Sequence, residues 1–174
     1  VQELPTHGGS LRVFAARADA AAHPQATHEG AARVAQLLAT EAAAGMLGDA
    51  FYSDFQPQAL RIKRELLSFL LQCQADGLTV GAYGAAAKGN TLLNFAGVRP
   101  DLLPYVVDKN PAKQGQYLPG SRIPIVDEAH LRAHRPDRVL ILPWNLRDEV
   151  AAQLACVRGW GGQFVVAVPW LEVF

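Results

Sequence analysis

Residues 84–93 (GAAAKGNTLL) combine small side chains, a lysine and a helical pattern, and they directly follow an apolar run at 79–83. In parallel α/β proteins, a tight turn from a strand into a helix brings backbone N–H groups together at the helix N-terminus. The helix dipole favours an anion there. Small side chains at 84–87 would let a ligand approach the backbone, and Lys88 adds a positive charge. The segment therefore predicts an anion site, with phosphate as the expected ligand.

The same segment matches none of the standard phosphate signatures. From Gly84 it reads G-x-x-x-x-G-N and lacks the Lys-Ser/Thr pair of a P-loop. From Gly81 it reads G-x-x-G, which differs from the dinucleotide-binding pattern G-x-G-x-x-G. A strand-to-helix turn that only packs closely would show the same small residues. The segment alone leaves both interpretations open.

Alternating strand and helix patterns position this turn. We expect strands at 79–83, 105–108, 123–126, 138–142 and 163–168, and helices at 87–96, 127–134 and 145–158. Short β-branched runs separated by helices predict a Rossmann-like parallel sheet of about five strands flanked by helices. A helical pair should precede it, at 31–45 and 54–76. The apolar face of the first helix comprises Ala31, Val34, Ala35, Leu38 and Ala42.

Polar residues follow two other strands of this predicted sheet, and parallel strands present their carboxyl ends at one edge. The second strand is followed by Asp108, Lys109, Asn110, Lys113 and Tyr117, and the fourth by Trp144 and Asn145. Asp108 could bind a ribose hydroxyl or cap a turn, and Trp144 could stack on a ring or belong to the core. Asn145 is expected to be the N-cap of helix 145–158.

Composition narrows the classes of partner. Lysine plus arginine and aspartate plus glutamate number 16 each, so no strong field attracts nucleic acid or an anionic membrane. No apolar run approaches the ~20 residues of a membrane span. Cys73 and Cys156 lie in apolar helical patterns without metal-ligand spacing. They predict reduced, buried thiols and a cytoplasmic location.

Several ordered motifs resemble one family, the S-adenosylmethionine-dependent C-methyltransferases that act on nucleotide-activated deoxysugars. The motifs are THGGSLRV at 6–13, GAAAKGNTLLN at 84–94, VDKNP at 107–111, KQG at 113–115, YLPG at 117–120 and ILPWNL at 141–146. The resemblance as a whole covers nearly all of residues 1–170. In that family a zinc-binding domain, a methyltransferase domain and a C-terminal Rossmann-like domain follow one another, and this chain is similar to the third.

The resemblance implies a separate role for each part of the chain. It assigns 1–30 to a trailing segment and linker from an upstream methyltransferase domain, 31–77 to a helical segment packing on the next domain, and 78–174 to a domain that anchors a nucleotide-diphosphate sugar. S-adenosylmethionine would bind upstream, zinc would belong to the absent N-terminal domain, and no catalytic residue is expected here. The upstream base would deprotonate carbon next to a ketone, and the enolate would attack the methyl sulfonium.

The substrate-binding residues implied by the motifs and strand ends are Gly84, Ala85, Ala86, Lys88, Asn90, Thr91, Asp108, Lys109, Asn110, Lys113, Tyr117, Trp144 and Asn145. Three other interpretations remain open at this point. One is a nicotinamide-binding oxidoreductase domain, with Asp108 on the ribose. Another is a non-catalytic docking or oligomerisation module, which would explain the helical segment 31–76. The third is a relative of the methyltransferases acting on a different activated ketone.

Overall fold

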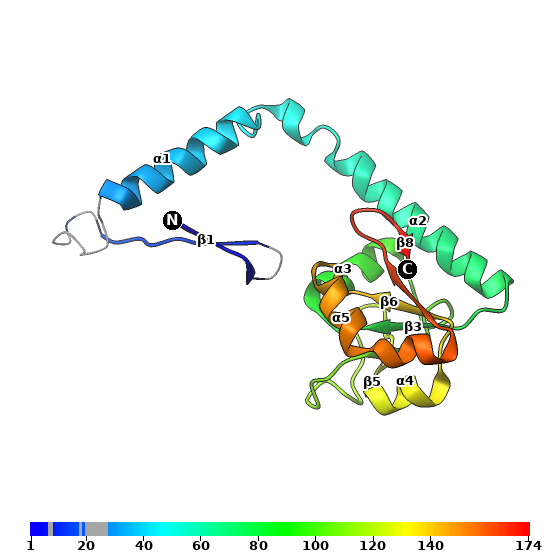
Figure 1. Ribbon diagram of the computed structural model, residues 1–174. Coiled ribbons are helices and arrows are strands. Elements are labelled where there is room, and N and C mark those ends of the chain that lie inside the picture. The colour runs from blue at the N-terminus through cyan, green and yellow to red at the C-terminus, as the bar shows by residue number, and fades with distance from the viewer. Residues whose placement is uncertain (7–8, 18, 20–27) are drawn as a thin grey trace. The chain divides into compact units, whose positions relative to one another are not determined.

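The computed structural model describes residues 1–6, 9–17, 19 and 28–174. The chain consists of two compact units, Val1–Pro57 and Gln58–Phe174 (Figure 1). All buried hydrophobic side chains among the described residues belong to the second unit. No helix in the described part of the chain has the length and apolar character needed to cross a membrane.

The second unit is built around a six-stranded sheet in the order β5–β4–β3–β6–β7–β8. The strands are β3 (Val80–Tyr83), β4 (Val106–Val107), β5 (Ile125–Val126), β6 (Arg138–Ile141), β7 (Gln163–Val166) and β8 (Glu172–Val173). Strands β3 to β7 pair in parallel, whereas β8 pairs antiparallel with β7. The predicted Rossmann-like parallel sheet is therefore confirmed. Strand β8 was not predicted.

Helices cover both faces of this sheet. One core joins α2 (Phe55–Ala75) and α3 (Ala87–Ala96) to one face, through fully buried residues such as Leu70 and Leu93. The other core joins α4 (Glu128–His134) and α5 (Arg147–Gln153) to the opposite face. Neighbouring residues of β3 alternate between the two, with Ala82 in the first core and Tyr83 in the second. This two-sided burial explains why the strands read as continuous apolar runs.

The helix predicted at 145–158 is wrong as a single element. The structure has η3 (Trp144–Leu146), α5, and η4 (Ala155–Trp160), where η denotes a 3₁₀ helix. Leu154 and Val157 are both fully buried, and their spacing of three matches the three residues per turn of a 3₁₀ helix. Asn145 accordingly lies inside η3, and Leu146 precedes α5, so the N-cap role expected for Asn145 is also wrong.

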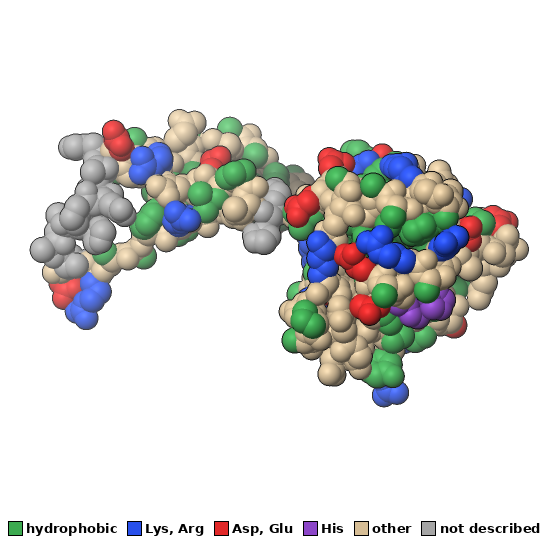
Figure 2. Space-filling model, turned by 60° about the horizontal axis from the view of Figure 1, so that its bottom comes forward, with side chains coloured by type: hydrophobic (Ala, Val, Ile, Leu, Met, Phe, Trp, Pro, Cys, Tyr) green, Lys and Arg blue, Asp and Glu red, His purple; other side chains and the backbone are tan. Residues whose placement is uncertain are grey.

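The first unit contains a hairpin and a helix. Strands β1 (Gln2–Leu4) and β2 (Ser10–Arg12) pair antiparallel, and α1 (His28–Ala43) and η2 (Asp49–Tyr52) follow. Helices α1 and α2 confirm the predicted helical pair as elements of the chain. No described side chain of this unit is buried, and hydrophobic side chains lie at its surface (Figure 2).

The two cysteines are reduced. Cys73 is buried in α2, where burial raises the pKa of its thiol, and Cys156 is partly buried. Neither forms a disulfide.

Candidate functional site

The order of the strands reverses between β3 and β6. From β3 the chain moves outward to β4 and β5 on one side, and then returns to β6 and β7 on the other. In open parallel sheets, ligands bind beyond the carboxyl ends of the strands at such a reversal. The chain leaves β3 at Gly84 and β6 at Leu142, so these two turns define the candidate site.

Two glycines let these turns approach each other. Gly84 has a φ of +90°, and a Cβ on it would lie 2.5 Å from Cδ of Pro143. A Cβ on Gly89 would lie 2.6 Å from Cβ of Leu142. Both glycines of the G-x-x-x-x-G pattern are therefore required for packing of the first turn of α3 against the segment after β6.

Most N–H groups of the turn have partners within the protein. Gly84 N–H donates to the Val107 carbonyl at 2.7 Å, Ala85 N–H to Asp108 Oδ2 at 2.8 Å, and Ala86 N–H to the Gly84 carbonyl at 2.7 Å. Ala86 is the N-cap of α3 and makes no side-chain capping hydrogen bond. The N–H groups of residues 87–89 have no hydrogen-bond partner in the described part of the chain. An anion held by this helix would therefore contact residues 87–89 rather than 84–86.

Lys88 faces a cavity of about 330 Å³ at this edge of the sheet. The lining residues come from α2, α3 and the segments after β6 and β7, and they are Ala59, Ile62, Lys88, Thr91, Leu92, Phe95, Trp144 and Val168. Lys88 Nζ lies 4.8 Å from the centre of the Trp144 ring, which allows a cation–π contact. Burial lowers the pKa of the Lys88 ammonium, and no described carboxylate lies within ion-pair distance of it.

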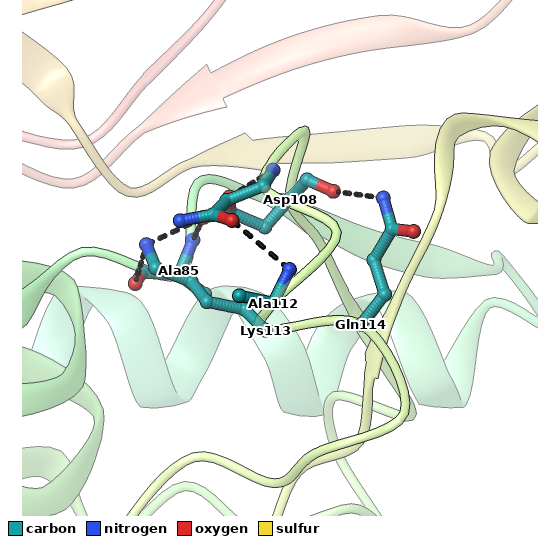
Figure 3. Close-up of polar contacts among 6 residues, drawn as sticks. Ala85, Asp108, Ala112, Lys113 and Gln114 are labelled. Carbon is teal, nitrogen blue, oxygen red and sulfur yellow. Dashed lines mark hydrogen bonds and ion pairs between the residues drawn. The ribbon is translucent and has the colours of Figure 1, made fainter.

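Asp108 organises the loop after β4 (Figure 3). Its Oδ2 accepts from Ala85 N–H and, at 3.0 Å, from Lys113 Nζ, while Oδ1 accepts from Asn110 N–H at 2.9 Å. Lys113 Nζ also donates to the Ala85 carbonyl at 2.9 Å, and Gln114 Nε2 donates to the Asp108 carbonyl at 2.9 Å. Asp108 and Lys113 thus fasten this loop to the turn after β3 and neutralise each other beside it.

The remaining predicted residues are distributed differently. Asn90 Oδ1 accepts from Asn94 Nδ2 at 3.1 Å, and Lys109 is exposed. Tyr117 is 65% exposed and forms an isolated bridge with Pro124 beside β5, so it does not line the cavity. Asn145 Oδ1 is buried without a partner among the described residues. The structure therefore brings Lys88, Thr91 and Trp144 to one cavity and groups Ala85, Asp108, Asn110 and Lys113 beside it.

Sequence reasoning missed the apolar part of the cavity. This part consists of apolar side chains whose types alone do not indicate a binding site, namely Ala59, Ile62, Phe95 and Val168. The contribution of α2 to the cavity follows only from how the helix packs. A stripe of apolar residues on that helix predicts burial, not which end of the sheet it covers. Among the described residues, no group of three or more His, Cys, Asp or Glu side chains is arranged to hold a metal ion.

The fold and the strand reversal define this part of the molecule as a Rossmann-like α/β domain with a cavity at its carboxyl edge. A family model described as "C-methyltransferase C-terminal domain" matches residues 5–169, and the chain belongs to this family. Its sequence is 36% identical over 169 residues to C-methyltransferase NovU of Streptomyces niveus. The match covers 97% of this chain but 39% of that relative, so the chain spans about two fifths of the relative's length.

Proposed function

We propose that this chain is the C-terminal, substrate-anchoring region of an S-adenosylmethionine-dependent C-methyltransferase. Its substrate would be a nucleotide-diphosphate sugar with a ketone next to the carbon that is methylated. An upstream domain would supply the methyl donor site and the base. The base takes the proton from this carbon, the enolate forms the new carbon–carbon bond, and the S–CH₃ bond of the sulfonium breaks. Zinc, if used, would bind in a further upstream domain.

The observation that carries the anchoring role is Lys88. Among the described residues, Lys88 is a cation without a carboxylate partner in the first turn of a helix whose N–H groups at 87–89 also have no partner, at the strand reversal. A diphosphate would satisfy both, because the helix dipole and the ammonium favour the same charge. Holding it there would orient the sugar toward the upstream domain and contribute proximity to catalysis.

The nicotinamide alternative loses its main residue in this arrangement. Asp108 already accepts three hydrogen bonds from Ala85, Asn110 and Lys113, so a ribose diol would have to compete with them. We therefore favour a role for Asp108 and Lys113 in shaping the loop, with Lys109 and Asn110 on the sugar-nucleotide side.

The test is Lys88→Ala in the full-length enzyme. We expect the KM for the activated sugar to rise on the order of 10- to 100-fold, the loss of one charge-assisted contact, with the KM for the methyl donor unchanged. Added salt should weaken sugar binding more in the unmodified enzyme than in the variant. Lys63→Ala is the matched control, since Lys63 lies over Phe95 at 5.3 Å but not at the start of α3.

An unchanged KM in Lys88→Ala, with an unchanged salt response, would show that the turn serves packing alone. A second measurement uses the 174-residue chain. We expect a nucleotide-diphosphate sugar to raise its Tm, and nicotinamide cofactors or S-adenosylmethionine to leave it unchanged. Saturable micromolar binding of the methyl donor to this chain would contradict the proposed division of labour.

A further inference from the structure

One face of α1 is apolar along its length but is open to solvent. Ala31, Val34, Ala35, Leu38 and Ala42, here called the α1 stripe, repeat at helical spacing and are all exposed. Val34 is 43% and Leu38 59% exposed. In a folded protein, a helix with such a stripe normally packs it against another element.

No described residue of the first unit covers this stripe. A 16-residue helix is marginal in water by itself, because most helical stability in proteins comes from packing. Farther along the chain, Leu47, Phe51 and Phe55 are also exposed, at 88%, 48% and 73%. Exposed apolar side chains therefore also follow the helix along the chain.

The hairpin is incomplete in the same way. Strands β1 and β2 pair only with each other among the described residues, and a two-stranded hairpin is marginally stable without further strands or a packed face. Arg33 Nε donates to the Val1 carbonyl at 3.0 Å and so ties the hairpin to α1. Arg33 lies on the face of α1 opposite the stripe, so this contact leaves the stripe uncovered.

We propose that the α1 stripe is an intramolecular docking surface, covered in the full-length enzyme by the region that precedes this segment. The inference rests on the proposed function, in which this chain is the C-terminal part of a longer protein. The relative is long enough for such a region, since the match spans 39% of it. A preceding domain would be joined directly to β1, so its effective concentration at the hairpin and the stripe would be high. It would extend the hairpin into a larger sheet and bury the stripe.

This placement differs from the division predicted from the sequence. That prediction assigns residues 31–77 to a helical segment packing on the following domain. The proposal instead assigns α1 to the preceding region and leaves the buried part of α2, with Leu66, Leu70 and Cys73, in the second unit.

Amide hydrogen exchange of residues 29–43 tests the proposal. We expect exchange at least about 100-fold slower in the full-length enzyme than in the 174-residue chain. The double variant Val34→Gln/Leu38→Gln should remove most of this protection. The control Gln36→Ala/Thr40→Ala, on the opposite face, should retain it.

Equal exchange of α1 in the two proteins would overturn the proposal, and this comparison needs no variant that might misfold. Protection that appears in the 174-residue chain and rises with its concentration would also overturn it, in favour of a second copy as the occupant. The Lys88→Ala kinetics depend on the second unit only. An unprotected α1 together with a raised sugar KM would therefore contradict this inference and leave the proposed function intact.

Discussion

The two units differ in whether they bury their apolar side chains. The second unit buries them on both faces of its sheet, and large side chains such as Phe164 and Leu93 are fully enclosed. The first unit has comparable apolar residues at helical spacing, yet Val34 and Leu38 are exposed and no described side chain is buried. The difference indicates that amphipathic pattern specifies a face, whereas burial requires a partner of sufficient size.

The same comparison separates two kinds of evidence about function. In the second unit, the packing itself positions Lys88 and Trp144 at one cavity, so an argument about binding can begin from this chain. In the first unit, the exposed apolar surface supports an argument only about what could cover it.

Truncation of Phe164 should have the largest effect on stability. This side chain is fully buried in β7 beneath the ring of Phe174, with centroids 5.9 Å apart. We expect Phe164→Ala to lower the free energy of unfolding of the 174-residue chain by about 3–5 kcal/mol. Urea unfolding followed by circular dichroism measures it. A loss below about 1 kcal/mol would show that the core of the second unit is loosely packed.

Substitution of Gly84, in the turn at the strand reversal, should reduce stability almost as much. Gly84→Ala adds a methyl 2.5 Å from Cδ of Pro143 at a residue with φ of +90°. We expect a loss of about 2–4 kcal/mol from overpacking and backbone strain together. Gly115→Ala is the control, because Gly115 has a φ of +79° with nothing within 4 Å of its added Cβ. Its loss should be only the strain, about 1–2 kcal/mol, and equal losses would exclude close packing as the reason for Gly84.

Asp137 makes a smaller, pH-dependent contribution to the stability of the folded chain. Its Oδ2 accepts from both the N–H and the hydroxyl of Thr79 at 2.7 Å, and these bonds lower the pKa of its carboxyl. Asp137→Asn should reduce stability at neutral pH by about 1–2 kcal/mol, since a neutral amide replaces a charged acceptor.

The sign of the pH dependence follows from this lowered pKa. The carboxylate contribution is fully present above the ordinary value of 3.8 and is lost as the pH falls through the lower folded pKa. The difference between the unmodified chain and Asp137→Asn should therefore shrink in acid. Unfolding curves from pH 7 to pH 2 measure it, with Asp101→Asn on the exposed surface as control. A difference that is constant across this range would contradict the assigned role.

The sequence predicted those strands and helices whose pattern of residues lies within a single segment. The strand around 79–83 and the helix at 87–96 were placed almost to the residue, because β-branched runs and helical periodicity lie within each segment. The prediction failed at 145–158, where three short elements, η3, α5 and η4, replace a single α-helix. Strands β1 and β8 were not predicted.

The features of the candidate site also fall into two groups, those that the sequence could predict and those that it could not. Lys88 and Trp144 could be proposed from their places after predicted strands, and the structure brings them to one cavity. The hydrogen bonds of Asp108 to Ala85 and Lys113 were not foreseeable, because they depend on how the loop between β4 and β5 folds back over the turn after β3. Nor could the sequence tell that Gly84 faces Pro143, a contact between residues distant along the chain.

The smallest expected effect is that of Leu38→Gln in the 174-residue chain. Leu38 is 59% exposed on α1, and glutamine has a helix propensity close to that of leucine. We expect the free energy of unfolding to change by less than about 0.5 kcal/mol, because the substitution removes no buried contact. The same measurement as for Phe164→Ala applies, with Thr40→Ala as a control on the opposite face of the helix. A loss above about 1 kcal/mol would mean that α1 packs against another element within this chain, and the contrast between the two units would then fail.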